Sequence, residues 1–201
     1  MDDVTKDQII ITKGISMINQ LTDGHVIKTM MKEHEHILKM LDELKQLRIL
    51  LLDVDENNCS GLIFKINQLT RKIISAEPHH KREEEVLFPI LKDKGTVGPT
   101  QHMVIEHEMM RVIKHKLKKE TKTIDGIGNE KLAKISSLIH ELCNILQLHI
   151  YKENTVLYPL ALNLIRDESI WIKMKNECDK IGYCCFCPDA NELDQALVNE
   201  K

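Results

Sequence analysis

Residues 79–89 read HHKREEEVLFP and residues 149–159 read HIYKENTVLYP, and the fold and the chemistry both follow from this pair of stretches. Each stretch has a histidine, a glutamate four residues later, an aliphatic pair, an aromatic residue and a proline. The second stretch begins 70 residues after the first. Residues four apart lie on the same face of a helix, so each stretch is expected to present a histidine beside a glutamate.

Four long segments around these stretches carry apolar residues at helical spacing, and short breaks rich in Gly, Asn, Asp or Pro separate them. We expect helices over residues 23–52, 56–92, 99–120 and 130–165. Four helices joined by short loops pack as an up-down-up-down antiparallel bundle. The sequence therefore predicts an all-α fold, with an N-terminal arm over 1–22, a four-helix bundle over 23–166, and a C-terminal helix with a cysteine-containing tail over 167–201.

The composition excludes several classes of partner. Lys and Arg number 28 against 31 Asp and Glu, so neither a nucleic acid nor an anionic membrane is expected to bind. The opening MDDVTKDQIIITKG is acidic and has no long apolar stretch. We therefore expect no secretory signal, no membrane anchor and a cytoplasmic location.

Six cysteines are present, and the clustering of four of them does not resemble a disulfide framework, which favours reduced thiols. These four lie in the tail, at Cys178, Cys184, Cys185 and Cys187. A zinc site, an iron–sulfur cluster or a redox pair remains open for them, although the adjacent Cys184 and Cys185 depart from the usual Cys-x-x-Cys spacing.

Polar residues interrupt the apolar stripe of every predicted bundle helix. The stripes contain His34 in the first helix, His79 and Glu83 in the second, His107 in the third, and His149 and Glu153 in the fourth, which is predicted to continue inward with Val156 and Leu160. An unpaired carboxylate in a core costs several kcal/mol, against a net folding stability of only ~5–15 kcal/mol. A metal centre is the expected compensation.

The repeat distinguishes these histidines from their neighbours. Glu33-His34-Glu35 recurs as Glu106-His107-Glu108, and each copy precedes its His-x-x-x-Glu pair by a similar interval. Each helical hairpin is therefore expected to give one histidine from its first helix and a His/Glu pair from its second. The other histidines are predicted not to be ligands: His25, His36, His80, His102, His115 and His140.

Four imidazoles and two carboxylates without a thiolate suit iron, manganese or zinc. Six side chains exceed the needs of one ion with an open position. They match two ions, each held by two histidines, with both glutamates and an oxide or hydroxide as bridges. A competing pattern, the Glu-x-x-His of ferritin-like bundles, occurs at Glu33/His36 and Glu77/His80 but is absent from the second half.

Three longer stretches carry a family resemblance: KEHEHILKMLDEL, HHKREEEVLFPIL with GTVGPTQHMVIEHE close behind, and HIYKENTVLYPLAL. Over residues 25–165 the chain resembles the hemerythrin-like (HHE cation-binding) proteins. The resemblance implies a bundle with two non-haem iron ions, preferred over Mn or Zn. It assigns the ligand positions to the same six residues, His34, His79, Glu83, His107, His149 and Glu153.

The resemblance also implies a function, in two versions. In the first, the centre binds a small molecule such as O2 or NO for sensing, storage or stress protection. In the second, a redox enzyme or iron-repair factor reduces peroxide or NO, or donates iron to damaged iron–sulfur clusters, with a protein redox partner. Four histidines with two glutamates look more like the repair-of-iron-centres branch than the oxygen carriers. That branch usually carries an N-terminal cysteine-containing domain, and residues 1–22 have no cysteine.

Three further expectations concern the surroundings of the centre. Pro78 should kink or bulge the second helix beside His79. Phe88 and Tyr158, one turn beyond the glutamates, should wall the pocket. No inward acid or base beyond the ligands is evident that could deliver protons for turnover, which favours a binding protein slightly over an enzyme.

Overall fold

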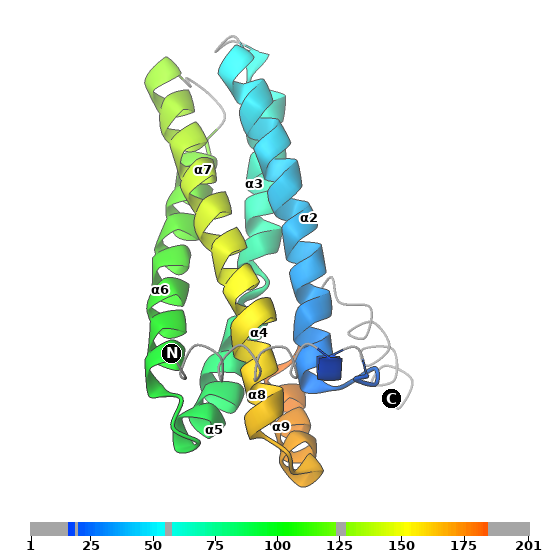
Figure 1. Cartoon of the computed structure of the whole chain (residues 1–201). Helices are drawn as coiled ribbons and strands as arrows, with labels where there is room; N and C mark the ends of the chain where they lie inside the picture. Colours follow the sequence, from blue (N-terminus) through cyan, green and yellow to red (C-terminus); the bar gives the residue numbers. More distant parts are fainter. Residues whose placement is uncertain (1–15, 19, 55–57, 124–127, 185–201) are drawn as a thin grey trace.

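The structure is a computed structural model that describes residues 16–18, 20–54, 58–123 and 128–184, and the regular elements in these ranges are all helices (Figure 1). The all-α prediction is confirmed. In chain order the elements are α2 (Val26–Asp53), α3 (Ser60–Ile74), α4 (Glu77–Arg82), η2 (Glu83–Leu87), α5 (Phe88–Asp93), α6 (Val97–Glu120), α7 (Asn129–Lys152), η3 (Glu153–Leu157), α8 (Tyr158–Leu164) and α9 (Glu168–Ile181).

The long helices α2, α3, α6 and α7 form four rods, which lie side by side (Figure 1). The helix α2 packs against α3 and α7, and α6 packs against the same two helices, so the rods close into a ring. Successive rods run in opposite directions. The second rod continues from α3 through α4, η2 and α5, and the fourth continues from α7 through η3 and α8. These two continued rods carry the repeated stretches.

The interior consists of two apolar clusters with a polar layer between them. One cluster contains Leu41, Ile66 and Leu142, and the other contains Phe88 and Trp171. Along each rod the predicted histidines and glutamates fall between the residues of these two clusters. The candidate centre is therefore enclosed by apolar packing on both sides.

The second rod is not the continuous helix that the sequence predicted. The helix α3 ends at Ile74, and α4 begins at Glu77 with Pro78 in its first turn. Proline lacks the N–H that a helix interior requires, but it is well suited to a first turn. Pro78 thus marks a helix restart directly before His79, which confirms the expected irregularity.

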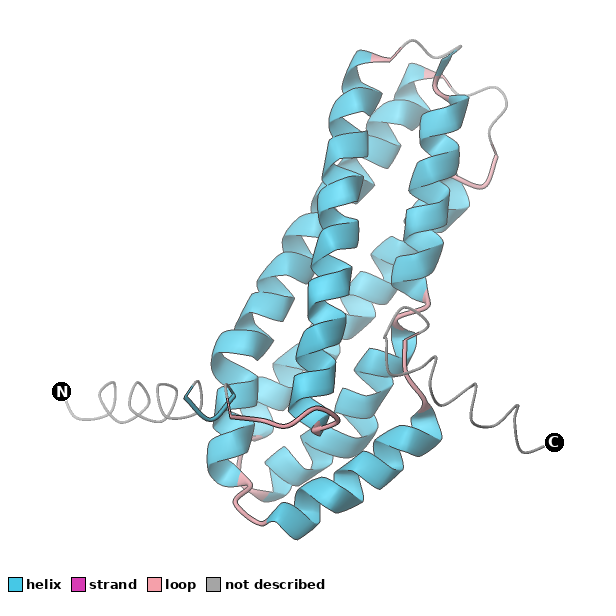
Figure 2. Ribbon diagram, turned by 90° about the vertical axis from the view of Figure 1, so that its right-hand side faces the viewer, coloured by secondary structure: helices cyan, strands magenta, loops and turns pink. Residues whose placement is uncertain are grey.

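The C-terminal helix α9 crosses the lower end of the rods, as Figure 2 shows, and contacts α2, α4 and η2. Trp171 Nε1 donates to the carbonyl oxygen of Ile165 at 3.0 Å and fixes the turn between α8 and α9. From the arm, Met17, Ile18 and Leu21 pack against the same end. The predictions for residues 1–15 and for Cys185 and Cys187 lie outside the described residues.

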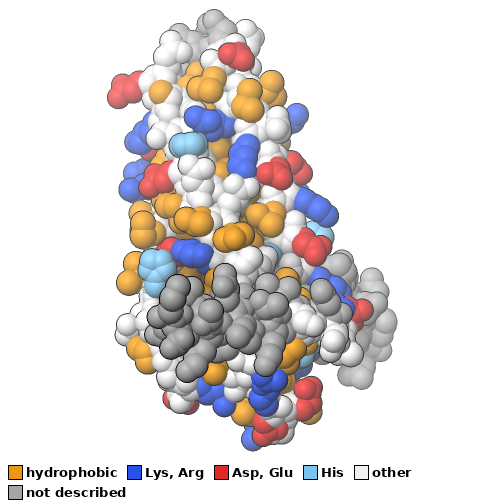
Figure 3. All heavy atoms as spheres, viewed as in Figure 1, with side chains coloured by type: hydrophobic (Ala, Val, Ile, Leu, Met, Phe, Trp, Pro, Cys, Tyr) orange, Lys and Arg blue, Asp and Glu red, His pale blue; other side chains and the backbone are white. Residues whose placement is uncertain are grey.

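The described side chains on the face drawn in Figure 3 mix apolar, basic and acidic types, without a large patch of one charge. This agrees with the near balance of 28 basic and 31 acidic residues. In the described part of the chain, none of the helices has the length and apolar character needed to span a bilayer.

Candidate metal centre

The six predicted residues converge in one buried layer. They come from six elements: His34 from α2, His79 from α4, Glu83 from η2, His107 from α6, His149 from α7 and Glu153 from η3. Each is at most 1% exposed. The pattern and the repeat together therefore selected residues that the fold brings together.

The four imidazoles form two pairs whose Nε2 atoms face each other. His34 Nε2 lies 2.9 Å from His79 Nε2, and His107 Nε2 lies 2.9 Å from His149 Nε2. Two nitrogens that bind one ion at ~2.1 Å each, at a right angle, lie about 3 Å apart. Each pair has the spacing of two ligands on one ion.

An oxygen atom lies beside the Nδ1 atom of every imidazole and fixes the tautomer. The pairs are His34 with Asn154 Oδ1 at 2.8 Å, His79 with Glu33 Oε2 at 2.8 Å, His107 with Glu84 Oε1 at 2.6 Å, and His149 with Glu106 Oε2 at 2.7 Å. These oxygens only accept, so Nδ1 carries the proton and Nε2 keeps its lone pair. Two facing lone pairs repel each other, and a cation between them removes that repulsion.

Both carboxylates reach both histidine pairs. Glu153 Oε2 lies 3.2 Å from His34 Nε2, and Glu153 Oε1 lies 2.9 Å from His149 Nε2. Glu83 Oε2 lies 3.6 and 3.4 Å from the Nε2 atoms of His79 and His107. Each glutamate therefore spans the two histidine pairs.

Three carboxylate oxygens in this layer are buried without a hydrogen-bond partner among the described residues: Glu83 Oε2, Glu153 Oε1 and Glu153 Oε2. Burial and the charge of Glu153 raise the pKa of Glu83 well above its usual value. Burial also acts to raise the pKa of Glu153, but the nearby histidines outweigh it and lower that pKa. Unpartnered oxygens and facing Nε2 lone pairs are the donor set that two cations require.

A π-helix begins at each glutamate. The backbone N–H of Phe88 donates to Glu83 O, and that of Tyr158 donates to Glu153 O, both five residues back. The following proline has no N–H to continue the α-helical pattern, and π-bulges occur often at functional sites. The shared ending of leucine, aromatic residue and proline thus shapes the backbone at both carboxylates.

The extra residue in each π-helix changes which side chains face inward. The predicted stripe placed Val156 in the core, but Val156 is 43% exposed and Leu157 is 2% exposed. The stripe prediction is therefore wrong beyond Glu153, because it assumed uninterrupted α-helical periodicity.

The repeated Glu-His-Glu has a role that sequence reasoning missed, since its first glutamate supports the next histidine of the same half. Glu33 accepts from His79 and from the fully buried Arg82. Burial acts to raise the pKa of Glu33, but His79 and Arg82 outweigh it and lower that pKa to about 2. Glu106 has the same place in the second half and pairs with Lys152. The recurrence of both glutamates in the sequence was the available signal.

The residue after each bridging glutamate supports a histidine of the opposite half. Glu84 accepts from His107 and from Arg111, whose Nη2 lies 2.9 Å from Glu84 Oε1. Asn154 has the equivalent place beside His34. The sequence repeat did not point to Glu84 and Asn154. The two positions carry different residue types, one charged and one neutral, so they do not stand out as a repeat.

The two aromatic residues are walls, as expected, but one of them also donates a hydrogen bond. Tyr158 is fully buried and its hydroxyl donates to Glu83 Oε1 at 2.7 Å. Its ring is parallel to that of His34, with centroids 5.6 Å apart. Phe88 takes the corresponding place beside His107 at 6.0 Å. Burial, followed by the charge of Glu83, raises the pKa of Tyr158, so the hydroxyl stays protonated.

His80 was predicted to be a bystander, yet it is only 5% exposed. Its ring stacks on that of His107 with centroids 4.0 Å apart. A nitrogen of His80 lies within 4.8 Å of ligand atoms of His107 and His149. The expectation that no further inward acid or base faces the layer is therefore wrong, since His80 and Tyr158 both do.

Of the ferritin-like pairs Glu33/His36 and Glu77/His80, only Glu33 and His80 lie at this layer. His102 is exposed and lies 2.9 Å from Glu106 Oε1, whereas Glu77 pairs with Arg111 and Lys114. None of the described clusters of metal-binding side chains includes Glu77 or His36.

The described part of the cysteine tail touches the layer through its backbone. The backbone N–H of Cys184 donates to Glu33 Oε1 at 3.2 Å, and the Tyr183 ring covers the Arg82 guanidinium at 4.6 Å. Cys178 and Cys184 are buried thiols, and burial raises the pKa of Cys178 to about 11. A protonated thiol is a poor metal ligand, so these two residues do not favour a second metal site.

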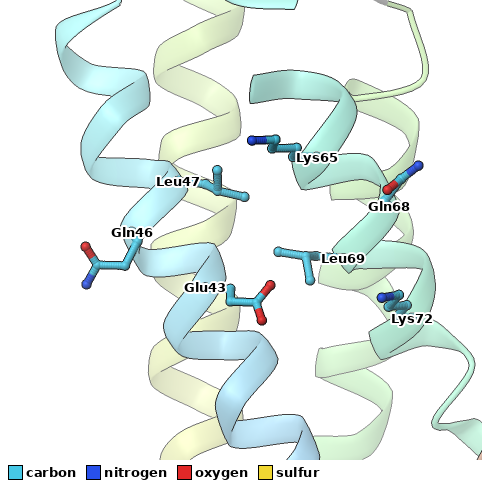
Figure 4. A pocket seen from close by; sticks show the side chains of 7 residues that line it. All are labelled: Glu43, Gln46, Leu47, Lys65, Gln68, Leu69 and Lys72. Carbon is cyan, nitrogen blue, oxygen red and sulfur yellow. The ribbon is translucent and has the colours of Figure 1, made fainter. Parts of the chain in front are cut away.

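A groove of about 430 Å³ lies between α2 and α3, and Figure 4 shows its lining of Glu43, Gln46, Leu47, Lys65, Gln68, Leu69 and Lys72. It contains no histidine or cysteine. None of the six converging residues lines it.

Comparison with known proteins adds a family to this geometry. The family described as Hemerythrin HHE cation binding domain matches residues 25–161. The iron-sulfur cluster repair protein YtfE of Enterobacter sp. (strain 638) is 34% identical over 109 residues, which are 51% of this chain and 47% of that protein. The protein of the same name from Salmonella schwarzengrund (strain CVM19633) is 35% identical over 91 residues, 42% of this chain and 40% of that protein.

The alignments with these relatives span less than half of each relative's length. The family match, in contrast, covers more than half of this chain and includes all six converging residues. The chain belongs to the hemerythrin HHE cation-binding family.

Proposed function

We propose that the protein is a four-helix-bundle, non-haem di-iron protein that binds a small molecule, O2 or NO, for sensing, storage or stress protection. His34 and His79 would hold one ion, His107 and His149 would hold the other, and Glu83 and Glu153 would bridge them. The observation that carries this proposal is the two pairs of facing Nε2 atoms. The two atoms of each pair lie 2.9 Å apart, and carboxylate oxygens without a hydrogen-bond partner lie between the pairs. Family membership supports iron as the metal.

When bound, the metal pair would supply an open position where a small ligand attaches and exchanges electrons. The protein supplies the rest. The Nδ1 partners hold the imidazoles in one tautomer, and the apolar clusters above and below the layer exclude bulk water. Two histidines and two bridging carboxylates per ion leave room for an additional ligand, whereas structural sites are closed.

A second candidate function is iron repair, in which the centre donates iron to damaged iron–sulfur clusters or reduces peroxide or NO. The observation that favours it is the name of the relatives, iron-sulfur cluster repair protein, at 34–35% identity. Those proteins are matched over less than half of their length, so this role is kept as the alternative.

Anaerobic purification followed by metal analysis and optical spectroscopy distinguishes the candidates. A reversible spectral change with O2 or NO on a protein that retains two irons would support binding. Irreversible oxidation with consumption of peroxide, or transfer of iron to a cluster-depleted acceptor protein, would support the alternative. Retention of zinc in place of iron would contradict both.

A further inference from the structure

His80 is a buried polar residue that the proposed centre leaves without a task. It makes no hydrogen bond to the described residues, and its Nδ1 atom is fully buried. The nearest charged oxygen, Glu77 Oε2, is 3.8 Å from Nδ1, which is too far for a hydrogen bond. Leaving such an atom unsatisfied is unfavourable, so an unpartnered group in a native layer calls for a ligand.

The orientation of the His80 ring determines what it can reach. Its plane is tilted by only 16° from that of His107, with centroids 4.0 Å apart, and it stands at 80° to the ring of His149. The Nε2 lone pair of His107 lies in the plane of its ring, so an ion held by His107 would lie in that plane. The nitrogens of a parallel ring point along their own plane, one layer away, so His80 is not aimed at that ion. A molecule that extends from the ion toward the plane of the His80 ring would meet the His80 nitrogens.

The two halves of the repeat differ at this position, because the second half has no equivalent of His80. His80 follows the first histidine of its His-x-x-x-Glu pair, and the residue that follows His149 is Ile150. Ile150 is 2% exposed and belongs to an apolar cluster. Beyond the six converging residues, the described part of the layer therefore offers a free polar group to a small ligand on the side near His107, where the other half has Ile150.

We propose that His80 is a ligand-binding residue, which hydrogen-bonds through a ring nitrogen to a small anion or diatomic molecule entering the centre beside His107. This inference rests on the proposed two-metal centre and adds the side on which the ligand sits. A neutral imidazole has one N–H and one lone pair. It therefore favours a ligand with an acceptor atom, or a protonated ligand, over an apolar one.

The test uses the iron-loaded full-length protein and azide as the probe. Wild type, His80→Ile and His80→Gln are compared for iron content and for azide affinity. The affinity is measured from the absorption change on azide addition. The isoleucine copies the residue of the other half, and glutamine keeps a donor and an acceptor. His115→Gln, an exposed histidine on α6, is the matched control.

We expect all variants to retain two irons. His80→Ile should weaken azide binding by about tenfold or more, because a hydrogen bond to a charged group is lost. His80→Gln should recover part of that loss, and His115→Gln should equal wild type. Unchanged azide affinity in His80→Ile would overturn the proposal.

Loss of iron from both His80 variants would also overturn it, because His80 would then be a direct ligand. Failure of the wild-type protein to hold two irons would instead contradict the proposed centre itself. Iron content is measured before any azide is added, so the two failures are distinguishable.

Discussion

The two halves of the candidate centre supply the same residues but surround them differently. In the first half, His34 is supported by the neutral Asn154, and His79 by Glu33, which is buried with Arg82. In the second half the two supporting groups are both carboxylates, and both are partly exposed. The repeat thus fixes where the six converging residues lie, whereas the charge around each histidine pair differs.

The two converging glutamates also differ, in their hydrogen-bond partners. Glu83 accepts a hydrogen bond from Tyr158, but both oxygens of Glu153 lack a partner in the described chain. Phe88, which occupies the place of Tyr158 in the other half, has no hydroxyl to offer. The two halves therefore surround their histidine pairs differently, and we expect the two proposed ions to be bound with different strength.

The largest expected effect comes from removing the glutamate that both halves share most closely. Glu153→Ala removes the carboxylate that lies 3.2 Å from His34 Nε2 and 2.9 Å from His149 Nε2. Iron content should fall well below two per chain, as measured by metal analysis after anaerobic loading. His36→Ala is the control and should retain both ions. Two tightly bound irons in Glu153→Ala would refute the bridging role.

The next effect distinguishes the buried glutamate beside His79, Glu33, from the partly exposed glutamate beside His149, Glu106. Glu33→Gln leaves the 1%-exposed Arg82 without its counter-ion, which should cost about 3–5 kcal/mol of unfolding free energy. Glu106→Gln leaves Lys152 near solvent and should cost about 1 kcal/mol or less. Urea unfolding of the metal-free proteins measures both. Equal costs would show that the two supports are energetically alike.

The third effect concerns metal affinity. Glu84→Ala removes a carboxylate beside His107. This should lower the affinity for the ion proposed to bind His107 and His149 about tenfold or more. Asn154→Ala removes a neutral acceptor beside His34 and should cost less, since charged acceptors bind more strongly. Competition with a chelator gives both values. A larger loss in Asn154→Ala would reverse the predicted order of the two sites.

The smallest effect is a pH dependence of the metal-free protein. Because the folded-state pKa of Glu33 is lowered to about 2 from its usual value of 4.5, its carboxylate stabilises the fold above pH 4.5, and this contribution disappears as the pH falls. The shift corresponds to about 3 kcal/mol, of which about 1 kcal/mol is lost by pH 4. The stability difference between wild type and Glu33→Gln should shrink between pH 6 and pH 4. A difference that grows on acidification would contradict the Glu33 interpretation.

The sequence contained enough to predict the helices and the six converging residues. Helical spacing placed histidines and glutamates in apolar stripes, and the repeat chose His34 and His79 over their neighbours. Spacing could not reveal the π-helices, which move Leu157 into the core in place of Val156. It also could not reveal the burial of His80, because the restart at Glu77 and the facing α6 decide which sides of α4 are covered.

Iron quantification with ⁵⁷Fe Mössbauer spectroscopy tests the central claim most directly, namely that two unequal half-sites form one two-metal centre. The anaerobically loaded wild-type protein should contain two irons per chain and give two quadrupole doublets of equal area, because the surroundings of the two histidine pairs differ. One iron per chain, or retention of zinc when iron is supplied, would contradict the centre. A single sharp doublet from two irons would contradict the inequality of its halves.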